Sequence, residues 1–153
     1  MDLILWRHAE ARDAEFGMSD FDRALTPRGE RQAAQMANWL NRHLPAGTRV
    51  LASPSRRTQQ TAAALGCKFK TVPELAPGAS VASLLAATRW PNATEPVLVV
   101  GHQPTLGLVA AHLLAGVGQP WSVKKGAVWW LHRRDRRGDD QTALFTVRGP
   151  DDV

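Results

Sequence analysis

Histidines and arginines stand just behind three short apolar runs of the sequence. The five side chains concerned are Arg7, His8, Arg56, Arg57 and His102. Guanidinium groups stay charged and present planar donor forks that match phosphate oxygens. A neutral imidazole can attack phosphorus, and a second histidine can donate hydrogen bonds to the group in transfer. These residue types predict a site that binds a phosphoryl dianion and transfers it through a histidine, with no metal required.

Three repeats of a strand, a polar loop and a helix position these side chains. The apolar runs predict strands over residues 3–6, 49–52 and 97–100. N-cap residues and prolines predict helices from Thr26 to His43, from Ser53 and Pro54 to Leu65, and after Pro104. Strands that alternate with helices indicate a parallel sheet, whose ligands lie beyond the carboxyl ends of the strands. The three loops are therefore expected to meet at one edge of the sheet.

The last part of the chain has the pattern of a β-hairpin. Two apolar segments, residues 127–131 and 143–147, flank the charged run 133–140, whose mixed signs indicate a solvated turn. The expected fold is an α/β three-layer sandwich with a mostly parallel sheet, helices on both faces and this hairpin at the sheet edge. The length of 153 residues fits a single domain over residues 1–153.

Composition limits the class of protein. No run approaches eighteen apolar residues and the N-terminal segment lacks a secretion-signal pattern, so no membrane span or export is expected. The single cysteine, Cys67, excludes an internal disulfide framework, and a reducing, cytoplasmic location is expected. The net charge of +5 fits nucleic acid, a phosphorylated partner or an arginine-rich surface, and charge alone does not choose among them.

Four motifs resemble, in the same order, those of the histidine phosphatase superfamily, which has the phosphoglycerate mutase-like fold. Residues 5–9 (Leu-Trp-Arg-His-Ala) resemble its opening Arg-His motif, and residues 53–62 resemble its Ser-Pro-x-x-Arg-x-x-Gln-Thr-Ala helix start. Residues 101–104 (Gly-His-Gln-Pro) match its late Gly-His motif. Residues 25–33 resemble the helix that follows the first loop of the family.

The resemblance implies a role for each of these side chains. His8 would be phosphorylated and His102 would stabilise the charge of the phosphoryl group. Arg7 and Arg57 would hold that group. The family's arginine stands four places after the serine of the motif, which assigns Arg57 rather than Arg56. The resemblance implies no metal and no other cofactor.

Within the superfamily, the sequence is most similar to the SixA-type phosphohistidine phosphatases, because it is short and has Ala9 after the first histidine. Larger members insert a helical lid with an acidic residue that protonates the leaving oxygen. Here only residues 66–96 fill the corresponding interval. The expected activity is dephosphorylation of phosphohistidine on a protein partner, such as a phosphotransfer protein.

Three further residues are candidates for the site. Glu74 or Glu10 could be the general acid, although neither has the surroundings that would identify one. Arg23 could bind the phosphoryl group through the first loop, but an ion pair with Asp20 or Asp22 fits its position equally well.

Three other activities stay open at the level of sequence. A small-molecule phosphomonoesterase, such as a sugar phosphatase, would use the same residues. A non-catalytic module could bind anions or nucleic acid through the arginines, but no tryptophan is interleaved with a basic stripe, so nucleic acid is not expected. Metal-assisted hydrolysis through His8, Glu10 and His102 is disfavoured because the arginines would repel a cation.

Overall fold

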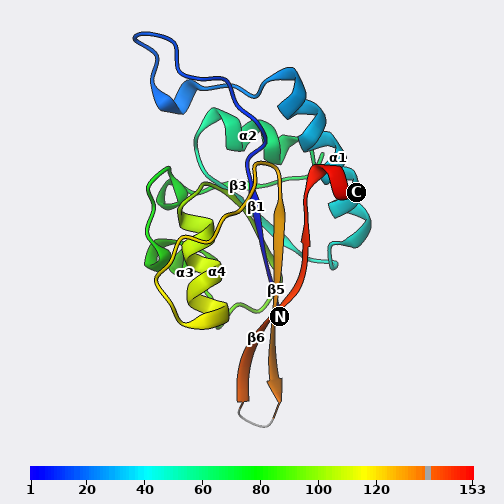
Figure 1. The fold of residues 1–153 in the computed structure, drawn as a ribbon. Coiled ribbons are helices and arrows are strands. Elements are labelled where there is room, and N and C mark those ends of the chain that lie inside the picture. Colours follow the sequence, from blue (N-terminus) through cyan, green and yellow to red (C-terminus); the bar gives the residue numbers. More distant parts are fainter. Residues whose placement is uncertain (137–138) are drawn as a thin grey trace.

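A six-stranded mixed sheet forms the centre of the molecule (Figure 1). The computed structural model describes residues 1–136 and 139–153. In spatial order the strands are β3 (Lys70–Thr71), β2 (Arg49–Ala52), β4 (Val97–Gly101), β1 (Asp2–Arg7), β5 (Val128–Arg136) and β6 (Asp139–Arg148). The first four run parallel, while β5 and β6 are antiparallel. The predicted α/β class, its three strands and its edge hairpin are confirmed.

Two pairs of helices cover the two faces of the sheet. The helices α1 (Pro27–His43) and α2 (Arg56–Ala63) pack on one face, and α3 (Val81–Thr88) and α4 (Thr105–Ala115) pack on the other. Short 3-10 helices occur in three connections: η1 (Asp20–Asp22), η2 (Pro73–Leu75) and η3 (Pro150–Asp152). No helix in the described ranges is long and apolar enough to cross a bilayer. These layers form the three-layer sandwich expected from the sequence.

The central strand β1 is buried on both faces. Leu3 and Leu5 pack toward α3 and α4, whereas Ile4 and Trp6 pack toward α1 and α2. All four side chains are fully buried. A strand covered on both faces needs a continuous apolar run instead of an alternating one, which is the pattern found in the sequence. Close packing on both faces fixes the position of the strand and hence of the loop that follows it.

The predicted helix from Thr26 to His43 is confirmed as α1. Thr26 is the N-cap residue, and its hydroxyl oxygen accepts a hydrogen bond from the backbone N–H of Gly29 at 2.9 Å. Pro27 occupies the first helical position, where its missing N–H leaves no hydrogen bond unmade. The helix following Pro104 is also confirmed, as α4.

The helix predicted from Ser53 and Pro54 begins later than expected. Its N-cap residue is Ser55, and α2 ends at Ala63 instead of Leu65. The Ser53 hydroxyl lies before the helix, where it accepts from the N–H of Ser55 at 3.4 Å and lies 2.7 Å from Nε2 of His102. The segment before α2 therefore stays a loop at the sheet edge.

The C-terminal hairpin is longer than predicted. The sequence predicts a solvated turn over 133–140, but strand pairing continues from Arg133 opposite Thr142 to Arg136 opposite Asp139. The prediction of a turn is therefore wrong for residues 133–136 and 139–140, where an antiparallel pair satisfies its backbone hydrogen bonds internally. The part of the predicted turn at 137–138 lies outside the described residues.

Backbone hydrogen bonds bring the three motif loops together. The N–H of His8 donates to the carbonyl oxygen of Gly101 at 3.1 Å, and the N–H of Ser53 donates to that of Val100 at 3.1 Å. These bonds continue the parallel ladders of β1 and β2 with β4 beyond the strands. The carboxyl ends of the three strands therefore lie side by side, as the sequence predicts.

Candidate active site

Two imidazole rings lie next to each other where β1 and β4 end. The ring centroids of His8 and His102 are 5.3 Å apart, and the ring planes are tilted by 55°. Both residues are buried, with 6% and 4% of their surface exposed. The structure thus brings together the two histidines of the first and last motifs.

The main chain holds the His8 ring in one tautomer. Its Nδ1 lies 2.8 Å from the carbonyl oxygen of Ala9, and since a carbonyl only accepts, Nδ1 carries the proton. The other ring nitrogen, Nε2, then keeps its lone pair. Burial lowers the pKa of His8 to about 4; the charges of Arg57 and Arg7 act in the same direction, against the Ala9 hydrogen bond. At neutral pH this ring has the form of an uncharged nitrogen nucleophile.

The His102 ring is oriented by a serine. Its Nε2 lies 2.7 Å from the Ser53 hydroxyl, and when that hydroxyl donates, Nδ1 carries the ring proton. Burial lowers the pKa of His102 to about 3, and the charges of His8 and Arg57 add to this effect. This arrangement presents a neutral N–H that can donate to an anion.

Two arginines bring positive charge to the same place. Arg7 ends β1 and donates from Nη1 to the carbonyl oxygen of Val123 at 2.8 Å. Arg57 lies in the first turn of α2 with 4% of its surface exposed, whereas its neighbour Arg56 is exposed. Burial and the charge of Arg57 both lower the pKa of Arg7. Of the two arginines in the motif, Arg57 is thus the buried one, and its charge acts on both histidines.

Three buried nitrogens of these residues have no hydrogen-bond partner in the part of the chain that the structure describes. They are Nε of Arg7, Nε of Arg57 and Nδ1 of His102. Unpaired buried donors are rare in folded proteins and are destabilising. A phosphoryl group has oxygens that can accept from such donors, and its charge offsets that of two guanidinium groups. The residues therefore fit a phosphoryl site.

Arg23 reaches this site through a carboxylate. Arg57 donates from Nη1 to the carbonyl oxygen of Asp20 at 2.8 Å and from Nη2 to its Oδ2 at 3.0 Å. Arg23 donates from Nη1 to Oδ1 of the same carboxylate at 3.1 Å. Burial acts to raise the pKa of Asp20, but the hydrogen bonds from Arg23 and Arg57 outweigh it and lower the pKa. Of the two partners open on the sequence, Arg23 thus has Asp20.

The candidate acids are engaged elsewhere. Glu10 accepts a hydrogen bond from the Thr26 hydroxyl at 2.7 Å, at the start of α1. Glu74 lies in η2 and lines a separate hollow beside β2 and β3. Within residues 1–136 and 139–153, no hydrogen bond or ion pair joins either carboxylate to the two histidines. The same ranges hold no group of three His, Cys, Asp or Glu residues suited to a metal ion.

A close backbone contact fixes the segment that follows His8. A Cβ atom at Gly29 of α1 would lie 2.0 Å from the carbonyl oxygen of Glu10, so this approach requires glycine. The N–H of Glu10 donates to Oε1 of Gln32 at 3.0 Å. The segment 25–33 therefore holds the residues that follow His8 in a fixed position.

Sequence reasoning missed two groups that contact the predicted residues. Ser53 was expected only as a helix cap, and the serine of its motif is the sole sequence signal for its contact with His102. Asp20 precedes Arg57 by 37 positions, and no spacing rule links the two. The only hint in the sequence of the position of Asp20 was its possible ion pair with Arg23.

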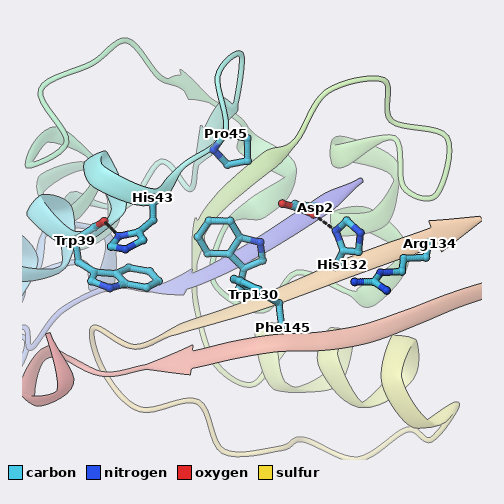
Figure 2. Close-up of a pocket in the computed structure, with 8 residues that line it drawn as sticks. All are labelled: Asp2, Trp39, His43, Pro45, Trp130, His132, Arg134 and Phe145. Carbon is cyan, nitrogen blue, oxygen red and sulfur yellow. Dashed lines mark hydrogen bonds and ion pairs between the residues drawn. The ribbon is translucent and has the colours of Figure 1, made fainter.

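An aromatic hollow lies at the other end of the sheet (Figure 2). It has a volume of about 370 Å³ and is lined by Asp2, Trp39, His43, Pro45, Trp130, His132, Arg134 and Phe145. The strand β1 runs from Asp2 at this hollow to Arg7 at the histidine pair, about 17 Å at roughly 3.3 Å per residue. None of the lining residues belongs to the four motifs. His43 stacks on Trp39 and His132 pairs with Asp2, so both have structural contacts.

Comparison with known proteins agrees with this geometry. The sequence profile described as histidine phosphatase superfamily (branch 1) matches residues 3–80, which include the first motif, the α1 segment and the second motif. The chain belongs to the histidine phosphatase superfamily. Among curated members, the phosphohistidine phosphatase SixA of Escherichia coli is 34% identical over 130 residues, 78% of each chain. An uncharacterized protein of Picosynechococcus sp. is 36% identical over 98% of this chain and 97% of its own.

Solved structures of the superfamily have the same fold. A SixA candidate from Nakamurella multipartitia superposes with a TM-score of 0.80 at 33% identity, over 97% of this chain and 95% of that one. The protein histidine phosphatase SixA complexed with tungstate superposes with a TM-score of 0.76 at 31% identity, over 98% and 97%. The resemblance to SixA-type members of the superfamily is thus confirmed.

Lysine in place of Arg57 should damage turnover far more than lysine in place of Arg56. The Arg57→Lys variant keeps the charge but loses the planar fork, so we expect a loss of about 2–4 kcal/mol, roughly 30- to 1000-fold in kcat/KM. Arg56→Lys changes an exposed side chain of the same helical turn and is the matched control. Steady-state hydrolysis of a phosphoramidate measures both, and a larger loss in Arg56→Lys would contradict the placement.

Acid should destabilise the protein through the two buried imidazoles. Unfolded histidine takes up a proton near pH 6.5, whereas His8 and His102 stay neutral in the folded protein down to a pKa of about 4 and about 3. The unfolded state then binds more protons below pH 6.5, and the free energy of unfolding falls from there to about pH 4. The slope is about 1.4 kcal/mol per pH unit for each histidine.

Urea denaturation over this pH range tests the effect. The His8→Asn variant should lose less stability than the wild type as the pH falls from 6.5 to 4. His112→Asn replaces an exposed histidine of α4 and should follow the wild type. Equal pH dependence in all three proteins would show that the buried ring does not titrate as described.

Proposed function

We propose that this member of the superfamily is a phosphatase that removes phosphoryl groups from phosphohistidine on a protein partner. The observation that carries the proposal is the uncharged Nε2 of His8 in the field of two guanidinium groups, those of the half-buried Arg7 and the buried Arg57. Membership of the superfamily supports phosphatase activity. The name of the Escherichia coli relative, phosphohistidine phosphatase SixA, supports the substrate class.

The proposed reaction has two displacements at phosphorus. Nε2 of His8 attacks phosphorus, and the bond from phosphorus to the substrate nitrogen breaks with its electron pair going to that nitrogen. Arg7 and Arg57 hold the equatorial oxygens while the N–H of His102 donates to one of them. Water then attacks the phosphorus atom on His8, the bond from phosphorus to Nε2 breaks with its electron pair returning to Nε2, and phosphate leaves after releasing one proton to solvent.

The proposal includes transfer without a metal ion and a location in the cytoplasm. Two guanidinium groups and a neutral imidazole supply the positive charge and the nucleophile that metal ions supply in other phosphatases. The location rests on the single cysteine, Cys67, which is exposed and free.

His8 should become phosphorylated during turnover. Rapid quenching with 32P-labelled phosphoramidate should trap label that is stable in base and labile in acid, as expected for a nitrogen–phosphorus bond. His8→Ala removes the attacking atom, so both label and turnover should disappear, whereas His112→Ala should match the wild type. Wild-type turnover in His8→Ala would refute the assignment.

The same labelling after exhaustive treatment with EDTA tests the metal-free step. Equal label with and without EDTA supports it, because the groups that hold the phosphoryl group belong to the protein. Loss of label that one added divalent metal restores would favour metal-assisted hydrolysis through the histidines.

Phosphohistidine should be a better substrate than alkyl phosphate. An alkoxide needs a positioned acid to leave near neutral pH. Asp20 is the carboxylate in contact with Arg57, and the hydrogen bonds that lower its pKa make it a poor proton donor. The leaving ring of phosphohistidine can be protonated on its distal nitrogen by solvent and depart as neutral imidazole. The site therefore suits a nitrogen leaving group.

The measurement is kcat/KM for a phosphohistidine peptide against a phosphoserine peptide of the same sequence and against sugar phosphates. We expect the phosphohistidine peptide to be at least about 100-fold better, the lower end of the usual contribution of a general acid. Equal or better turnover of the alkyl esters would support the sugar-phosphatase alternative. If Glu74→Gln or Glu10→Gln then abolished that turnover, the residue concerned would be the acid.

A further inference from the structure

The loop between β1 and α1 projects from the body of the molecule on a fixed stem. Ala11 and Leu25 form an antiparallel bridge, and the N–H of Arg12 donates to the carbonyl oxygen of Ala24 at 2.8 Å. Figure 1 shows the loop leaving the carboxyl end of β1 and extending beyond the helices before it returns to α1. Its tip can therefore contact a second molecule that the body of the protein does not reach.

Three large apolar side chains of this loop point into solvent. Phe16 is completely exposed, at 110%, and Met18 and Phe21 are 38% and 43% exposed. Phe16 and Met18 flank a turn in which Gly17 has a φ of 81° and the N–H of Met18 donates to the carbonyl oxygen of Glu15 at 2.9 Å. Burial of such side chains stabilises a complex, so apolar groups gathered at a loop tip mark a surface for protein contact.

The loop is tied to the phosphoryl site by one residue. Asp20, in η1 of the same loop, accepts hydrogen bonds from Arg57 through both its main chain and its side chain. Phe21 follows it directly and Met18 precedes it by two residues. A protein that delivers a phosphoryl group to Arg57 would therefore lie close to this loop, whereas free phosphohistidine has no protein part to contact Phe16.

The charges on the loop indicate which charges the partner surface carries. Asp13, Glu15 and Asp22 are exposed on the loop among the apolar side chains. A complementary surface therefore has apolar side chains surrounded by lysine or arginine. Because acidic side chains repel an anion, the loop itself does not bind the phosphoryl group, which is left to Arg7 and Arg57.

We propose that residues 13–22 form a docking surface for a folded protein that carries phosphohistidine beside an apolar patch with basic surroundings. The inference rests on the proposed function and adds the element that recognises the protein part of the substrate. Phe16 and Met18 supply the apolar contact, and Asp20 links the loop to Arg57. Through this contact the loop favours a protein substrate over free phosphohistidine.

Two substrates and matched variants test this surface. The substrates are a purified phosphotransfer domain phosphorylated on histidine and free phosphohistidine. The variants are Phe16→Ala, Phe16→Ala with Met18→Ala, and Phe145→Ala, which removes a side chain 68% exposed on β6. We expect Phe16→Ala to lower kcat/KM for the domain about 10-fold through a higher KM, with free phosphohistidine unchanged. Phe145→Ala should leave both substrates unchanged.

A binding titration measures the affinity of docking separately from catalysis. In a His8→Ala background, Phe16→Ala should weaken the affinity for the phosphorylated domain about 10-fold, and Glu15→Lys should weaken it as well. Unchanged affinity and unchanged KM in the loop variants would overturn the docking surface while leaving the phosphatase proposal intact. Equal losses on both substrates would also overturn it. A wild-type dimer that becomes a monomer in Phe16→Ala would overturn it too, because the loop would then bind a second copy of this chain. Failure of the wild type on both substrates would refute the proposed function, and the titration would still decide docking.

Discussion

The placement of two guanidinium groups beside two buried imidazoles, with Arg57 buried and Arg7 half-buried, is the constraint on which the rest of the site depends. Burial and the charge of Arg57 lower the pKa of Arg7, and burial together with the arginine charges keeps His8 and His102 neutral. Neutrality gives His8 a lone pair for attack and leaves His102 with an N–H to donate. The same charges would be unfavourable in a site that bound a cation, and they are offset when a dianion binds.

This charge cluster can exist only because the sheet holds it rigidly. Arg7 and His8 follow a strand that is buried on both faces, and the N–H of His8 is bonded to Gly101, one residue before His102. A shift of one residue would turn each side chain of β1 to the opposite face and would bury Arg7 in the core. The register that packs the apolar side chains of β1 is therefore also the register that brings the histidines together.

The sequence predicted the parts of this structure that depend on local patterns. The apolar run before Arg7 and the proline after Thr26 mark a buried strand and a helix start, and both are present. Contacts between distant loops could not be predicted from the sequence. The Ser53 hydroxyl binds His102 instead of capping α2, and Asp20 binds Arg57. Such contacts depend on how two loops fold over one sheet edge, which residue spacing does not encode.

Asp20 links catalysis and recognition in this site. Its carboxylate and carbonyl orient the guanidinium group of Arg57, which requires that it stay ionised, and an ionised carboxylate cannot protonate a leaving group. The carboxylate in contact with Arg57 thus orients the group that would hold phosphate and does not protonate the leaving group. Asp20 also belongs to the projecting loop. A protein docked on Phe16 and Met18, as proposed, would therefore influence the orientation of Arg57 through Asp20. Under the proposed function, a site built in this way would gain its selectivity from the protein that carries the phosphoryl group more than from acid catalysis.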